Sequence, residues 1–160
     1  MSAPDDGFSE WFRAEYPPVL RVVSLIVGDV GVAQEVTQDA FEQVLRRWTK
    51  VRTYDRPGAW VRRVAIRKAV RTRDRRAREP RFAPIDTNAT PPDPDLVAAI
   101  ASLPRAQRAA IALFYLEDRP VAEVAELMGC TESTVKVHLH RARGRLAEVL
   151  ALDPEEVAGE

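Results

Sequence analysis

The sequence predicts an all-α protein: two small helical domains joined by a Pro-rich flexible linker, the second domain containing a helix-turn-helix. Three observations support this. Apolar residues recur at intervals of three and four, which is the period of a helix rather than of a strand. Five of the twelve prolines lie between Glu79 and Asp95, where they would interrupt any helix. After residue 120, a short apolar helix, a glycine and a second helical segment follow one another.

Length and composition narrow the class of protein. The chain has 160 residues and one cysteine, so we expect one or two small globular units without an internal disulfide. No set of Cys and His has the spacing of a structural zinc site, and we expect neither a metal nor a cofactor. No apolar stretch is long enough to span a bilayer. A cytoplasmic protein without membrane insertion is therefore expected.

The charges are strongly segregated, although the formal net charge is zero. Residues 1–45 have a net charge of −6, whereas residues 46–78 carry fourteen Arg or Lys against two acids, a net of +12. Residues 79–130 have a net charge of −4, residues 131–150 of +2 and residues 151–160 of −4. This distribution amounts to two basic patches in an acidic body, and the density of the first patch indicates a polyanionic partner.

The proline-rich segment sets the expected domain boundaries. Five prolines and several small polar residues give residues 79–95 the composition of a flexible linker. The first domain is then residues 1–78, the second domain is residues 96–152, and residues 153–160 form an acidic tail.

Four helices are expected in the first domain, at about Phe8–Tyr16, Val19–Ile26, Val32–Thr49 and Pro57–Arg78. The third of them has an apolar face and, largely away from that face, a polar row with three acids. Taken alone, such a row is most often an ordinary solvated face. The polar row consists of Gln34, Glu35, Gln38, Asp39 and Glu42.

The fourth expected helix combines apolar, basic and aromatic residues. Pro57 suits its first turn. Ile66 and Val70 interrupt its polar side, so either a second helix packs there or something apolar meets it. Arginines outside the apolar face, together with Tyr54 in the preceding loop, could hold phosphates while a ring stacks on an unpaired base. Trp60, like Trp48, is more often a core residue than a ligand contact.

Helices are also expected at about Asp95–Ala101, Arg105–Leu116, Val121–Met128 and Thr131–Leu150. The last two flank Gly129 with helix-turn-helix spacing, and Thr131 is the expected cap of the second. Four residues of this last helix lie on an inward arc: Val135, Leu139, Ala142 and Leu146. The opposite arc would face the DNA major groove, with arginines following toward the phosphates. An ordinary helical hairpin with a basic rim would have the same pattern.

Four segments resemble, in this order, conserved segments of bacterial RNA polymerase sigma factors of the sigma-70 family, of the small extracytoplasmic-function (ECF, group 4) type. Val32–Phe41 resembles the acidic, Gln-containing part of the second conserved region of the family, and Arg56–Ala65 resembles its Trp-containing segment. Leu103–Arg108 and Gly129–Arg143 resemble the fourth region. The resemblance spans nearly the whole chain.

The resemblance implies a factor, not an enzyme and without catalytic residues, that binds core RNA polymerase and promoter DNA and promotes DNA melting for transcription initiation. An anti-sigma factor is a further candidate partner. The polar row of the third helix would bind the polymerase. The implied minus-ten contacts are Tyr54, Arg62, Arg63, Arg67 and Arg71, and the implied minus-thirty-five contacts are Ser133, Thr134, Lys136, Val137, His140, Arg141 and Arg143.

The runner-up function class is a dimeric helix-turn-helix transcriptional regulator, which would bind operator DNA without core polymerase. A nucleic-acid enzyme lacks support, because no carboxylate pair and no Cys/His cluster has the spacing of metal ligands.

Overall fold

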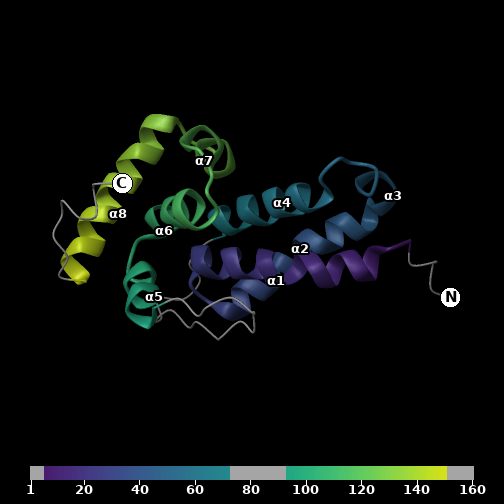
Figure 1. The fold of residues 1–160 in the computed structure, drawn as a ribbon, viewed down its shortest axis with the longest axis horizontal. Helices are drawn as coiled ribbons and strands as arrows, with labels where there is room; N and C mark the ends of the chain where they lie inside the picture. The colour runs from purple at the N-terminus through teal and green to yellow at the C-terminus, as the bar shows by residue number, and fades with distance from the viewer. Residues whose placement is uncertain (1–5, 73–92, 151–160) are drawn as a thin grey trace.

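The computed structural model describes residues 6–72 and 93–150, and every element in these ranges is helical, which confirms the all-α class. The N-terminal helices are α1 (Phe8–Val27), α2 (Val30–Arg46), the short α3 (Trp48–Val51) and α4 (Pro57–Arg71). Figure 1 shows α1, α2 and α4 as neighbouring rods in one half of the molecule. Much of the expected linker and the whole acidic tail lie outside the described residues.

The C-terminal helices occupy the other half of the molecule, with α8 at its far end (Figure 1). They are α5 (Pro94–Ala101), α6 (Arg105–Ile111), the π-helical turn η1 (Ala112–Leu116), α7 (Val121–Met128) and α8 (Glu132–Val149). The expected helix from Arg105 to Leu116 therefore exists, but its last turn is widened into a π-helix.

The prediction of two separate helices before residue 27 was wrong, because α1 continues through Pro17 and Pro18. A proline removes the N–H that would bond to the carbonyl four residues earlier. The two carbonyls affected here belong to Arg13 and Ala14, which are exposed, so water can satisfy them.

Two further boundaries differ from the prediction. The expected helix from Val32 to Thr49 is divided between α2 and α3, because Arg47 leaves helical geometry with φ −118° and ψ 21°. The helix that begins at Pro57 ends at Arg71, since Thr72 is extended, and residues 73–78 lie outside the described residues.

The helix-turn-helix has the predicted turn. Gly129 ends α7 with φ 70°, a left-handed conformation that glycine adopts without strain. The Thr131 side chain then caps α8 by accepting a hydrogen bond from the backbone N–H of Thr134 at 3.1 Å, as predicted. Val135 and Leu139 are buried on the side of α8 that faces the core, so the opposite side of this helix points outward.

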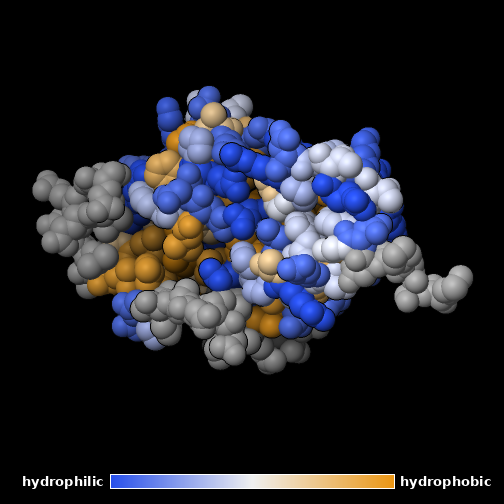
Figure 2. All heavy atoms as spheres, turned by 45° about the vertical axis from the view of Figure 1, so that its right-hand side comes forward, coloured by the Kyte–Doolittle hydropathy of each residue, from blue (hydrophilic) through white to orange (hydrophobic). Residues whose placement is uncertain are grey.

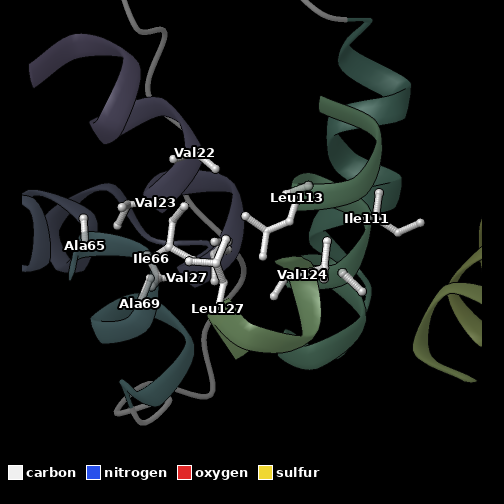
Figure 3. Packing of buried hydrophobic residues seen from close by; sticks show 14 of the residues in the cluster. Val22, Val23, Val27, Ala65, Ile66, Ala69, Ile111, Leu113, Val124 and Leu127 are labelled. Atoms are coloured by element: carbon white, nitrogen blue, oxygen red, sulfur yellow. The ribbon is translucent and has the colours of Figure 1, made fainter. Parts of the chain in front are cut away.

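The two halves share one buried apolar cluster. Figure 3 shows Ile66 of α4 and Val27 of α1 close to Leu127 of α7, with Leu113 of η1 nearby. Ile66 is 0% exposed although it lies on the polar side of α4, so the C-terminal helices are the apolar partner that its position required.

Arg108 of α6 joins the halves by hydrogen bonds. Its guanidinium is buried and donates from Nε to the carbonyl of Ile26 at 3.1 Å, and from Nη2 to that of Val27 at 3.5 Å, both at the C-terminal end of α1. A positive charge there is favoured by the helix dipole. Gly28, with φ 74°, ends α1, and an added Cβ would lie 3.4 Å from the Arg108 guanidinium.

Candidate nucleic-acid interface

The outer face of α8 is an exposed, mostly polar row. Cap geometry and the burial of the inward arc position it away from the core. The side chains on this row can donate to base acceptors or to phosphates, and the Val137 side chain, 45% exposed, can contact a thymine methyl. The exposed members are Ser133, Lys136, Val137, His140 and Arg141.

Two residues predicted for the same interface are partly buried and already have partners. Thr134 lies in the first turn, and its hydroxyl is 2.8 Å from that of Thr131. Arg143 donates from Nε to the Tyr115 hydroxyl at 2.6 Å and lies 5.4 Å from the centre of that ring. Because η1 presents Tyr115 to α8, the Arg143 guanidinium is held at the edge of the row rather than extended into solvent.

The polar row of α2 is exposed along its whole length: Gln34, Glu35, Gln38, Asp39 and Glu42. Its acids are available to a basic partner. Hydrophilic side chains cover much of the side of the molecule that Figure 2 shows. Asp39 lies beside a groove of about 470 Å³ whose opposite wall includes Arg67, Lys68 and Arg71 of α4. Opposite charges therefore lie close together where the predicted polymerase-binding surface on α2 adjoins the predicted DNA-binding surface on α4.

Arginines of the basic face of α4 form ion pairs with acids of the C-terminal half. Arg62 Nη1 is 3.1 Å from Glu117 Oε2, and Arg67 Nη2 is 3.7 Å from Glu126 Oε1. Arg63 also pairs with Glu126. Of the four predicted minus-ten arginines, the structure therefore brings three against acids of the C-terminal half, while Arg71 is exposed at the end of α4.

Tyr54 lies in the loop that precedes α4, as expected, and its side chain is close to that helix. Its ring centre is 6.3 Å from that of Trp60, and both rings line a groove of about 350 Å³ together with Arg63 and Ile66. Trp48 instead packs against Phe8 and Trp11, with ring centres 5.3 and 5.0 Å away, and is partly buried against the core.

Sequence reasoning missed the residues that join the two halves. Arg108 lies in a segment that resembles the fourth region, but the resemblance gave it no role, and Glu117 and Glu126 were given none either. The partners of these three residues in the N-terminal half lie more than fifty positions away. The available signal was Ile66, an aliphatic residue on an otherwise polar side of its helix.

The described residues form no candidate metal site. Across residues 6–72 and 93–150, no three His, Cys, Asp or Glu side chains are grouped so that they could hold an ion. Partial burial raises the pKa of the Cys130 thiol, so this group is protonated at neutral pH. In the part of the chain that the structure describes, we find no helix with the length and apolarity of a membrane span.

Two family profiles match the chain. The profile for sigma-70 region 2 matches residues 11–79, and that for sigma-70 region 4 matches residues 95–146. The RNA polymerase sigma-E factor of Streptomyces coelicolor is 30% identical, over 89% of this chain and 85% of that protein. The ECF RNA polymerase sigma factor SigM of Mycobacterium tuberculosis is 28% identical, over 90% of this chain and 77% of that protein.

The fold is also similar to a solved structure. The sigma factor RpoE of Bartonella quintana, crystallised with the anti-sigma factor NepR, aligns with a TM-score of 0.65 and 22% identity over 91% of this chain and 98% of that one.

Proposed function

This chain belongs to the sigma-70 family of RNA polymerase sigma factors, of the ECF type, and on that basis we propose which of its surfaces bind core polymerase and which bind promoter DNA. The acidic row of α2 binds core polymerase. Tyr54 and the arginines of α4 (Arg62, Arg63, Arg67 and Arg71) hold the separated minus-ten strand. The outer face of α8 binds the minus-thirty-five element through Ser133, Thr134, Lys136, Val137, His140, Arg141 and Arg143.

The observation that carries this assignment is the helix-turn-helix. Its turn at Gly129 and cap at Thr131 direct an exposed row of donors outward from α8 while apolar residues hold the helix from beneath. This is the geometry with which a recognition helix enters the major groove. Membership of the sigma-70 family does not favour the alternative, a dimeric regulator that acts without polymerase.

The proposal also covers partners and setting. Sigma factors are generally not enzymes, and we assign no reaction to this chain. Core polymerase and promoter DNA are its partners, and we propose a cytoplasmic location because both are found there in bacteria. An anti-sigma protein is a further proposed partner, since the similar RpoE was crystallised with one.

Promoter opening tests the function. With purified core polymerase, the protein should start transcription at defined sites, and permanganate should detect unpaired thymines in the minus-ten region. We expect Tyr54→Ala to reduce opening about tenfold or more, because stacking contributes ~1–3 kcal/mol per base. Binding of the closed duplex should stay near that of the parent, and pre-opened templates should restore transcription. Normal opening by Tyr54→Ala would remove Tyr54 from the site, and core polymerase that never starts transcription with the parent would refute the function.

A second prediction separates base reading from phosphate contact on α8. Lys136→Ala and His140→Ala should each relax preference at one or two minus-thirty-five positions, at ~1–3 kcal/mol per contact. Arg141→Ala, on the same exposed face, should weaken binding evenly across sequences and reduce the salt dependence. Affinities for a library of single-base variants of the duplex measure both effects. Relaxed base preference in Arg141→Ala alone would mean that the assigned face of α8 is wrong.

A further inference from the structure

A tyrosine outside the recognition helix holds one of the arginines of that helix. Arg143 donates a hydrogen bond from Nε to the Tyr115 hydroxyl at 2.6 Å. Its guanidinium carbon lies 5.4 Å from the centre of the Tyr115 ring and 6.0 Å from that of the Phe114 ring. A cation is attracted to the face of an aromatic ring at such distances. The hydrogen bond and the two rings together restrict where the Arg143 guanidinium can lie.

The π-helical turn η1 brings both rings to α8. The backbone N–H of Glu117 donates to the carbonyl of Ala112 at 3.0 Å, five residues back, so this turn is one residue wider than a turn of α-helix. Phe114 and Tyr115 are consecutive, and both lie against the same guanidinium. Their rings meet nearly edge to face, with centres 4.9 Å apart and planes at 86°. Single π-helical turns are frequent at functional sites.

The hydrogen bond to Tyr115 leaves the outer end of the guanidinium available. Arginine has five N–H donors, one on Nε and two on each terminal nitrogen. Tyr115 accepts from Nε, whereas Nη1 and Nη2 make no hydrogen bond to the residues that the structure describes. These two nitrogens can donate paired hydrogen bonds to two oxygens of one phosphate. Tyr115 therefore leaves only the terminal pair for a phosphate, which determines how that fork is oriented.

Arg143 lies on the side of α8 that carries the candidate base contacts. Lys136, His140 and Arg143 are separated by four and three residues, so they follow one another along one face of the helix. Lys136 and His140 are exposed, whereas Arg143 is partly buried. At 1.5 Å per residue, Arg143 lies about 10 Å farther along the helix than Lys136. A recognition helix contacts bases with its N-terminal residues, so Arg143 is placed for a phosphate that flanks them.

We propose that Tyr115 is a positioning residue for promoter binding, which holds the Arg143 guanidinium toward one phosphate of the minus-thirty-five element. The inference rests on the function proposed above, which assigns α8 to this element. An arginine side chain has many rotamers, and ordering it during binding lowers affinity. Because Tyr115 orders Arg143 before DNA binds, less affinity is lost. Tyr115 acts through Arg143 and reads no base.

The nuclear magnetic resonance signal of the Arg143 Nε–H tests this hydrogen bond without DNA. In the full chain we expect this proton to exchange with water about tenfold or more slowly than that of the exposed Arg141, because it is bonded to a protein acceptor. Tyr115→Phe should remove the protection. The control Tyr16→Phe removes the same hydroxyl from α1 and should not. Equal exchange of Arg143 and Arg141 in the parent would overturn the proposal without bearing on the function.

Uncharged phosphates test which DNA group Arg143 contacts. The probes are fragments of a promoter mapped with the parent, each with one methylphosphonate in the minus-thirty-five element, bound by the full chain assembled on core polymerase. One replacement should weaken binding of the parent about tenfold and binding of Arg143→Ala not at all, because it removes a charge-assisted contact. At that position Tyr115→Phe should lose only about threefold, since its guanidinium is no longer ordered. All other positions should give equal losses in the three proteins.

Affinities for the unmodified promoter complete the test. Tyr115→Phe should bind about threefold more weakly than the parent, with the same preference among single-base variants, and Tyr16→Phe should bind as the parent does. In an Arg143→Ala background, Tyr115→Phe should have no further effect. An equal loss in both backgrounds, or a methylphosphonate profile of Tyr115→Phe identical to that of the parent, would overturn the proposal. If the parent on core polymerase binds no promoter, the function itself fails, while proton exchange still reports whether Tyr115 holds Arg143.

Discussion

Replacing Glu35 and Asp39 together by lysine is expected to weaken binding to core RNA polymerase about a hundredfold or more, because like charges facing each other across an interface cost several kcal/mol. Both side chains are exposed on α2, and the residues that bury this helix, such as Ala33 and Val44, lie on its other face. The substitutions should therefore leave the fold intact. Competition with the parent for labelled core polymerase measures the loss.

The matched control reverses two exposed acids elsewhere. Glu10→Lys with Glu148→Lys makes the same change in net charge, on α1 and α8. If this control weakens binding as much as the α2 variant, the effect comes from overall charge rather than from the proposed surface. Unchanged binding by the α2 variant would remove that surface from the interface.

Replacing Arg108 by methionine is expected to lower the free energy of unfolding by about 3 kcal/mol, because several buried carbonyls lose a charged donor and each unsatisfied group costs about 1–3 kcal/mol. The carbonyls belong to both halves: Ile26 and Val27 at the end of α1, and Ala101 and Leu103 beside α6. Methionine retains apolar packing, so the loss reports the hydrogen bonds rather than a cavity.

Urea unfolding followed by circular dichroism measures this loss. Arg21→Met, at an exposed position of α1, is the control and should change stability by a few tenths of a kcal/mol. Coincident unfolding curves for the two variants would mean that the Arg108 hydrogen bonds contribute nothing net to stability.

Local patterns were sufficient to predict the C-terminal helix-turn-helix. Gly129 and Thr131 have short-range roles, a left-handed turn and a cap, and residue type determines both within a few positions. The phase of the helical period then predicted that Leu139 points inward and Lys136 outward. In the structure Leu139 is buried and Lys136 is exposed. The exposure of the acidic row on α2 follows from the same period.

Features that depend on distant partners could not be predicted in the same way. Pro17 and Pro18 were expected to end a helix, and nothing local indicates that exposed carbonyls and the buried residues after them let α1 continue. The pairing of Arg62 with Glu117 joins residues 55 positions apart. A sequence shows that both are charged, but not that a shared apolar contact at Ile66 brings them together.

Gly28 is constrained over evolutionary time by its backbone rather than by the side chain packed against it. The turn after α1 requires a residue that tolerates φ 74°, which favours glycine. A Cβ at this position would lie 3.4 Å from the Arg108 guanidinium, which is an ordinary van der Waals contact. A descendant with another residue at position 28 would therefore strain the turn whether or not it kept Arg108. Glycine at position 28 should thus persist in descendants that have lost Arg108.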